Sequence, residues 1–482
     1  MIRDLRDWIA AVEARGDLCR VDGAHWDLEV GGLTELNNRR RRPPALLFDR
    51  IPDYPAGHRV LTSSVVTPSR LGLTLRLGAD LTDRELVQRV RAKPAEWAAA
   101  AKGFDPRVVA DGPVHARIRR GPDVDLTALP APRWHERDGG RYLGTACLVL
   151  TRDPETGWVN GGSYRAMIAG PAALTVFILP GKHGRMHLEK WWAMGRPAPM
   201  AISLGHDPLL AVLAGIEIPH EVSELNYAGA VMGEPLEVFE GGITGLPLPA
   251  AAEVVAEGFC HPGDVRPEGP FGEYLGYFSG GKEPQTVLTV EALYRRDDPI
   301  LLGAKMSRPP NDISYFSAVI RSALAFNQLE AAGVPGVTGV WNHPLGGARK
   351  FLVVAIKQLY PGHARQAGVV AGQCRAAAQA GRFVIVVDDD IDPTNEGDVL
   401  WAVATRCDPA TDIDIIRDCW SSPVDPTIPP DKRSVRNFTN SRAIINACRP
   451  YHWKDQYPKV NRASDELREK ARKKWEELFS AL

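Results

Sequence analysis

The period of the hydrophobic pattern changes near Asp312, and this change restricts the fold more than any other feature of the chain. From about Val114 to Met306, alternating and β-branched residues around Pro/Gly turns predict strands. A hairpin is expected around the turn Asp153–Gly157, and the stretch 286–306 is expected to form a second strand pair. This part of the chain is therefore predicted to be a β-rich middle domain.

After Asp312, helical segments alternate with strands. Buried strands are predicted at Phe351–Gln358 and Phe383–Val387 and a further strand at Asp412–Ile416, with helices between them. This alternation is typical of an α/β layer built on a parallel sheet. The expected fold class is therefore α/β, or α+β for the chain as a whole.

Helices with one apolar face are predicted near both ends of the sequence. The N-terminal face consists of Ile2, Leu5, Trp8, Ile9 and Val12. The C-terminal face consists of Leu467, Ala471, Trp475, Leu478 and Leu482. We expect the terminal helix to dock on another subunit, which predicts a homodimer or a larger homo-oligomer. The expected domains are an N-terminal α/β domain (1–113), the β-rich domain (114–306), a C-terminal α/β domain (307–450) and an oligomerisation helix (451–482).

Charge and cysteine content argue against several classes of protein. The 482 residues include 58 Lys and Arg against 59 Asp and Glu, a balance that argues against a nucleic-acid binder. The seven cysteines are scattered and form no C-x-x-C pair, which suits a reducing compartment rather than a disulfide framework. The first residues are too charged for a signal peptide, and no apolar run is long enough to span a bilayer. We expect a cytoplasmic protein that binds neither nucleic acid nor membranes.

Several catalytic motifs are absent from the sequence or incomplete in it. It contains no Gly-rich nucleotide fingerprint and no nucleophile elbow. His183 and His187 have the spacing of a zinc-protease helix, but residue 184 is glycine where that motif needs glutamate. The acidic run Asp388–Asp392 follows a buried strand. Without a phosphate-binding loop, we interpret it as a turn and helix cap rather than a Mg²⁺ site.

Four separated pieces of the middle domain have functional character. Asn160-Gly-Gly-Ser-Tyr-Arg165 combines two glycines, which let the backbone approach a ligand closely, with a guanidinium fork. The other pieces are GKHGRMHLEKWW around His183, SELNYAGA around Glu224, and EGPFGE with Glu268 and Glu273. The Gly-Pro-Phe-Gly turn folds the last two carboxylates towards a common site, where one can act as an ionised base and the other as a proton donor.

Together the four pieces resemble the UbiD family of reversible decarboxylases, and the resemblance extends over essentially the whole chain. It implies that the middle domain is a split-barrel flavin-binding domain and that the cofactor is prenylated FMN, supplied by a flavin prenyltransferase. The family's catalytic Arg-Glu-Glu network maps onto Arg165, Glu268 and Glu273. The cofactor-binding residues that the resemblance implies are Asn160, Ser163, Tyr164, Arg165, Lys182, His183 and Glu224.

The resemblance also implies two cations. Its divalent-metal ligands map onto Asn160, His183 and Glu224, and this oxygen and nitrogen set independently suits Mn²⁺ or Mg²⁺ better than zinc. A monovalent ion, K⁺ or Na⁺, is implied to bind backbone carbonyls, including one near Arg406. The stretch CRAAAQAG lacks the lysine that ferulic acid decarboxylases use for the flavin phosphate, so we expect phosphate binding to rely on the metal and on Lys182 or Lys357.

The implied activity is reversible, non-oxidative decarboxylation of a (hetero)aromatic acid, with CO₂ as the second product. Loss of CO₂ from an aromatic ring leaves a carbanion that needs an electron sink. The resemblance implies that the modified flavin provides this sink by bonding covalently to the substrate, with Glu273 as the proton donor. Three alternatives stay open: a decarboxylase of cinnamic or phenolic acids, a flavin reductase-like oxidoreductase, and a non-catalytic flavin-binding protein.

Two features of the sequence bear on the choice of substrate. Ser422-Pro-Val-Asp425 stands where ferulic acid decarboxylases line the pocket with Phe, so we expect a smaller and more polar pocket. Asn311 is either a hydrogen-bond partner of the substrate or the cap of a helix beginning at Asp312. As a substrate ligand it would favour a pyrrole, indole or furan acid, which predicts the heteroaromatic branch of the family.

Overall fold

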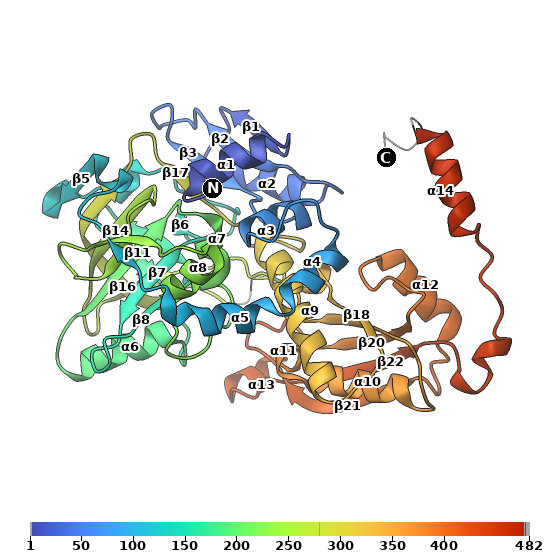
Figure 1. Ribbon diagram of the computed structural model, residues 1–482. Coiled ribbons are helices and arrows are strands. Elements are labelled where there is room, and N and C mark those ends of the chain that lie inside the picture. Colours follow the sequence, from blue (N-terminus) through green and yellow to red (C-terminus); the bar gives the residue numbers. More distant parts are fainter. Residues whose placement is uncertain (1, 279, 477, 479–482) are drawn as a thin grey trace.

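The computed structural model describes residues 2–278, 280–476 and 478, and its mixture of sheets and helices confirms the predicted α/β class (Figure 1). Within these residues the strands form four sheets: a four-stranded N-terminal sheet, a ten-stranded central sheet, a small three-stranded sheet and a five-stranded C-terminal sheet. No helix in the described ranges is both long and apolar enough to cross a membrane.

The N-terminal sheet has the order β1-β2-β3-β17, and α1 packs on it. Helix α1 begins after the cap Asp4, and Leu5, Trp8, Ile9 and Val12 are its buried residues. The predicted helix is confirmed with four of the five residues of its apolar face, whereas Ile2 precedes the helix. The elements of this region are α1 (Leu5–Glu13), β1 (Leu18–Asp22), α2 (Glu29–Asn38), β2 (Ala45–Asp49), β3 (Arg59–Thr62), α3 (Pro68–Thr74), α4 (Asp83–Val90) and α5 (Lys93–Ala100).

The central sheet is a curled half-barrel. Its main path is β6-β9-β10-β16-β14-β11-β7-β8, and β5 and β15 add to β16. Leu148 and Leu150 face one hydrophobic cluster while Val149 faces another, because successive side chains of a strand point to opposite faces and both faces are covered. The strands are β5 (Arg117–Arg120), β6 (Tyr142–Gly144), β7 (Leu148–Arg152), β8 (Val159–Gly162), β9 (Ala166–Gly170), β10 (Ala173–Val176), β11 (Ala198–Leu204), β14 (Val254–Cys260), β15 (Val265–Glu268) and β16 (Glu283–Arg295).

The hairpin predicted around Asp153–Gly157 is confirmed, because β7 and β8 pair antiparallel on either side of that turn. Three helices lie beside the half-barrel (Figure 1). They are α6 (His183–Ala193), α7 (Pro208–Ala214) and α8 (Glu224–Met232). The small sheet consists of β4 (Arg107–Val108), β12 (Glu237–Glu240) and β13 (Pro247–Pro249).

The prediction that residues 286–306 form a strand pair is wrong. Strand β17 (Ile300–Leu302) leaves the central sheet and pairs in parallel with β3 of the N-terminal sheet. All three of its residues are buried: Ile300 and Leu302 pack with α1, and Leu301 packs with the core of the half-barrel. A strand with two apolar faces needs a layer on each side, and a hairpin with β16 would not provide both.

The C-terminal sheet has the order β18-β19-β20-β22-β21, in which β19, β20 and β22 run parallel. The predicted α/β layer is therefore confirmed at its centre. The strand predicted at Asp412–Ile416 exists as β21, but it pairs antiparallel at the edge. The elements are α9 (Asp312–Ala331), β18 (Val337–Asn342), β19 (Phe351–Ile356), α10 (His363–Gln373), α11 (Arg375–Ala378), β20 (Phe383–Asp388), α12 (Glu396–Arg406), β21 (Ile413–Trp420), α13 (Pro430–Ser434) and β22 (Thr439–Ala447).

The chain ends in an arm that stands away from the rest of the molecule (Figure 1). Its helix α14 (Asp465–Lys474) begins after the cap Ser464, whose side chain accepts a hydrogen bond from the Leu467 amide. Leu467, Trp475 and Leu478 are exposed. Leu482, the last residue of the predicted stripe, lies outside the described residues.

Candidate active site

The structure brings Arg165, Glu268 and Glu273 into direct contact. The guanidinium of Arg165 binds both oxygens of Glu268, through Nε to Oε1 at 3.0 Å and Nη2 to Oε2 at 2.9 Å. Its remaining nitrogen, Nη1, donates to Oε1 of Glu273 at 3.1 Å. One guanidinium therefore holds two carboxylates that lie 103 and 108 residues further along the chain.

The turn between the two glutamates is shaped by close backbone contacts. Gly269 has φ of +87°, which favours glycine, and a Cβ on Gly272 would lie 2.9 Å from the Met306 carbonyl oxygen. The Glu273 amide donates to the Tyr277 carbonyl at 2.9 Å. These contacts bend the chain after β15 so that Glu273 returns to the side of Arg165, as the sequence predicts.

The two carboxylates have different surroundings. Glu268 is 1% exposed, and its Oε1 also accepts a hydrogen bond of 2.6 Å from the Tyr142 hydroxyl. Burial, followed by the charge of Glu268, raises the pKa of Tyr142, so the hydroxyl stays a donor. Glu273 lines a cavity, whereas Glu268 lies behind Arg165. The arrangement pairs a buried, fixed carboxylate with an accessible one.

The predicted metal ligands lie along the same cavity. Asn160 comes from β8, while His183 and Glu224 are the first residues of α6 and α8. Oε2 of Glu224 accepts a hydrogen bond of 2.6 Å from the Gly161 amide, which ties the start of α8 to β8. A Cβ on Gly161 would lie 3.2 Å from the Glu224 Cβ, so the close approach relies on glycine.

Tyr164 is held between two other glycines. A Cβ on Gly162 would lie 2.3 Å from its ring, and a Cβ on Gly184 would lie 2.7 Å from it. The Tyr164 hydroxyl accepts hydrogen bonds from the Gly184 amide at 3.2 Å and from Nδ2 of Asn160 at 3.5 Å. The amide nitrogen of Asn160 is thereby occupied, and its oxygen is the atom suited to a metal.

The donor set fits a divalent cation. Burial raises the pKa of the Glu224 carboxyl to about 7, and no cationic side chain among the described residues forms an ion pair with it. Burial, with the nearby charge of His220, lowers the pKa of His183 and favours its neutral, ligating form. A buried carboxylate with no counter-charge, an amide oxygen and a neutral imidazole suit Mn²⁺ or Mg²⁺.

A cavity of about 890 Å³ connects these residues. It lies between the half-barrel and the C-terminal domain, with the Phe177 ring 4.0 Å below the Arg165 guanidinium. Every predicted cofactor-binding residue lines it: Asn160, Ser163, Tyr164, Arg165, Lys182, His183 and Glu224. Phe177 and His220 also line it, although neither stands in a motif that could have indicated a role.

Three other sequence-predicted positions lie away from the cavity wall. Asn311 caps α9: its oxygen accepts from the Ser314 amide at 2.9 Å, and its Nδ2 donates to the carbonyls of Ser307 and Tyr274. Its capping role is thus observed, while a contact with substrate stays a prediction. Lys357 is exposed, and Arg406 pairs with Asp388 and Asp390 in the C-terminal domain.

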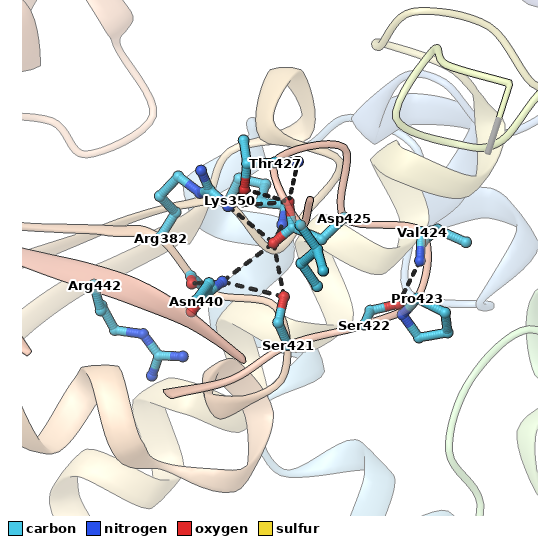
Figure 2. Close-up of polar contacts among 12 residues, drawn as sticks. Lys350, Arg382, Ser421, Ser422, Pro423, Val424, Asp425, Thr427, Asn440 and Arg442 are labelled. Carbon is cyan, nitrogen blue, oxygen red and sulfur yellow. Dashed lines mark hydrogen bonds and ion pairs between the residues drawn. The ribbon is translucent and has the colours of Figure 1, made fainter. Parts of the chain in front are cut away.

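The segment Ser422–Asp425 does not line the cavity in this structure, so the expected small polar pocket wall is not found there. Figure 2 shows Asp425 turned into the C-terminal domain, where it contacts Lys350, Arg382, Ser421 and Asn440. The Asp425 carboxylate forms ion pairs with Lys350 and Arg382 and is completely buried. A buried aspartate that holds two cations turns inward rather than towards the cavity.

Comparisons with known proteins agree along nearly the whole chain. Three profiles of 3-octaprenyl-4-hydroxybenzoate carboxy-lyase match: the N-terminal domain at residues 9–90, the Rift-related domain at 107–309 and the C-terminal domain at 314–447. Pyrrole-2-carboxylic acid decarboxylase of Pseudomonas aeruginosa is 32% identical over 467 residues, which cover 94% of this chain and 92% of the relative.

Solved structures give the same result. The UbiD-class enzyme HmfF from Pelotomaculum thermopropionicum, in complex with FMN, has a TM-score of 0.83 at 27% identity, covering 96% of this chain and 98% of that chain. An evolved dimeric form of HmfF, in complex with prFMN, has a TM-score of 0.80 at 26% identity, covering 97% and 98%. Apo 3,4-dihydroxybenzoic acid decarboxylase of Klebsiella pneumoniae has a TM-score of 0.84 at 26% identity, covering 98% and 100%.

Proposed function

This chain belongs to the UbiD family of carboxy-lyases, and from this premise we propose that it is a reversible, prenylated-FMN-dependent decarboxylase of a heteroaromatic acid. The observation that carries the proposal is the Arg165–Glu268–Glu273 group at one side of a cavity of about 890 Å³, with a fitting set of metal ligands on the same wall.

When bound, the prenylated flavin supplies the electron sink that loss of CO₂ from an aromatic ring requires. Glu273 supplies the proton for the ring carbon that the carboxylate leaves, because it is the accessible carboxylate of the pair. Arg165 holds Glu273 in position through Nη1, and Glu268, fixed by Tyr142, balances the guanidinium charge. In the reverse direction Glu273 would take the same proton back.

Asn160, His183 and Glu224 would hold Mn²⁺ or Mg²⁺ beside the cofactor phosphate, and Lys182, the residue before α6, would add a positive charge there. A monovalent K⁺ or Na⁺ near Arg406 stays part of the proposal as the family resemblance implies it. Flavin prenyltransferase would supply the cofactor.

The heteroaromatic class is supported by the pyrrole-2-carboxylic acid decarboxylase, at 32% identity over nearly the whole chain. A phenolic acid is the second candidate, since a 3,4-dihydroxybenzoic acid decarboxylase has the same fold at 26% identity. The reductase alternative receives no such support, because it would leave the paired carboxylates without a task.

The proposal is tested by expressing the chain together with a flavin prenyltransferase and measuring CO₂ release from pyrrole, indole, furan, dihydroxybenzoic and cinnamic acids. We expect release from a heteroaromatic acid, and only from protein whose bound flavin has the mass of the prenylated form. Oxidation of reduced nicotinamide without CO₂ release would favour the reductase. Release from no acid by fully loaded protein would refute the proposal.

A further inference from the structure

Three arginines of the C-terminal domain line the wall of the cavity opposite the half-barrel. Arg321 comes from α9, Arg349 from the loop before β19, and Arg375 is the first residue of α11. Gln379 and Trp420 complete this arginine wall. Nη1 of Arg349 donates to the Gln379 side chain at 3.1 Å, and this hydrogen bond joins the loop before β19 to the residue that follows α11.

In the part of the chain that the structure describes, Glu217 is the carboxylate that forms ion pairs with the arginine wall. Glu217, from the segment between α7 and α8, lies 3.4 Å from Arg321 and 3.3 Å from Arg375. Burial would raise its pKa, but the charges of Arg321, Arg375 and Arg349 outweigh this effect and lower it. The Glu217 side chain is 56% exposed and both distances are long, so these pairs are weak. Three positive charges therefore face one loosely held negative charge.

The guanidinium groups also crowd one another. The pKa of Arg321 is lowered to about 10, mainly because the side chain is buried and secondly because the positive charge of Arg349 is near. Like charges near one another are costly unless a counter-charge lies between them. Planar guanidinium groups bind carboxylate and phosphate oxygens with paired hydrogen bonds, which makes such an anion the natural counter-charge.

Polar contacts inside the C-terminal domain fix the segments that carry the arginine wall, and Figure 2 labels Lys350, Ser421, Asp425 and Arg442 among the residues that make them. Lys350, next to Arg349, pairs with the buried Asp425 at 2.6 Å, and Ser421, next to Trp420, donates to the same carboxylate at 2.7 Å. Nη2 of Arg442 donates to the Ala378 carbonyl at 2.6 Å, at the end of α11. These contacts fix the loop, the strand end and the helix that carry the wall residues.

We propose that the arginine wall is an anion-binding subsite for a carboxylate or phosphate group of a molecule in the active-site cavity, and that Glu217 is the resident counter-ion that this anion displaces. The subsite rests on the proposed function only in taking this cavity as the active site. The anion has two sources: a second acidic group on the ring acid, or the phosphate of the flavin. Both present the same chemistry to Arg349 and Arg375.

Binding measurements on purified protein test the proposal without any need for turnover. Arg349→Gln and Arg375→Gln remove one charge each, and Arg365→Gln is the matched control, an arginine of the same domain outside the cavity lining. In the first arm, apoprotein is titrated with FMN and with riboflavin. In the second, FMN-loaded protein is titrated with pyrrole-2-carboxylate and with pyrrole-2,5-dicarboxylate.

If the phosphate is the anion, each test variant should bind FMN about tenfold more weakly and riboflavin unchanged. If the substrate supplies it, the variants should lose about tenfold for the diacid alone. Glu217→Gln should tighten binding of the same ligand, which structural damage would not do. Unchanged affinities in both arms would overturn the subsite. Failure to release CO₂ would refute the proposed function alone, since these titrations do not depend on it.

Discussion

The protonation state of the Glu224 carboxyl should control how tightly the proposed metal site binds its ion. Its pKa is raised to about 7 by burial, above the value in an unfolded chain. A raised folded-state pKa stabilises the metal-free protein at low pH, and this stability is lost as pH rises through about 7. Metal binding needs the ionised form, so protons compete with the metal below that pH.

We therefore expect Mn²⁺ affinity to fall by up to about tenfold for each pH unit below 7. Titration calorimetry between pH 5.5 and 8 measures this dependence. Glu224→Gln should bind Mn²⁺ weakly at every pH, while Glu221→Gln, an exposed neighbour, should behave as wild type. A pH-independent affinity in the wild type would show that Glu224 is not a ligand.

Tyr142 is the residue that fixes Glu268. Its hydroxyl is buried and donates to the carboxylate at 2.6 Å. In Tyr142→Phe we expect the free energy of unfolding to drop by about 1.5–3 kcal/mol, the usual loss for a hydrogen bond to a charged group. Urea denaturation measures the loss. Tyr360→Phe, which removes a solvent-exposed hydroxyl, is the control and should cost less than about 1 kcal/mol. Equal losses in both variants would contradict the role given to Tyr142.

Asp425 connects the segment that follows β21 to the loop before β19, through its ion pair with Lys350. Burial would raise its pKa, but hydrogen bonds from Lys350 and Ser421 hold the pKa well below its usual range. A lowered folded-state pKa means that the stability it provides is present above the unfolded value and is lost as pH falls.

Asp425→Asn should therefore reduce the free energy of unfolding by about 3–5 kcal/mol at pH 7, because it leaves Lys350 and Arg382 without their counter-charge. The difference from wild type should shrink as pH is lowered towards acid. Urea denaturation at pH 7 and pH 3 measures both effects, with Asp431→Asn on α13 as the exposed control. A difference that is small at pH 7, or that does not shrink at pH 3, would contradict this assignment.

Local patterns predicted elements whose partners are close in sequence. The α1 face and the β7–β8 hairpin follow from spacing and turn residues alone. Strand β17 could not be placed, because its partner β3 lies more than two hundred residues earlier. Strand β22 escaped notice because its sequence, TNSRAIINA, mixes polar and apolar residues, including the buried Arg442.

The candidate site likewise has one part that local sequence predicts and another that depends on residues far apart in the chain. The approach of the two glutamates could be predicted because a short turn joins them. The proposed metal ligands stand in motifs that resemble the family's, and their role stays a prediction. The arginine wall was not predictable from the chain alone. Arg321, Arg349 and Arg375 stand in three unrelated contexts, and only tertiary packing brings them to one cavity.

For the whole molecule, the terminal arm is the feature that implies assembly. An isolated helix as short as α14 is not stable in water on its own. Leu467 on this helix, and Trp475 and Leu478 after its end, are exposed. We propose that it docks on a second copy of the chain. Truncation after Arg462 should convert dimers or larger oligomers into monomers, as measured by size-exclusion chromatography with light scattering. Leu467→Ala with Trp475→Ala should weaken association in the full chain, and an unchanged oligomer in both would contradict the proposal.

We propose that Arg165, Glu268 and Glu273 form the proton-transfer centre of a decarboxylase. Hydrogen–deuterium exchange into the decarboxylated ring, followed by NMR in D₂O with cofactor-loaded protein, tests it most directly. We predict deuterium at the carbon that carried the carboxylate, with the rate reduced by about 10²–10⁴ in Glu273→Gln and unchanged in Glu291→Gln, an exposed glutamate on β16. Exchange at the wild-type rate in Glu273→Gln would contradict the account.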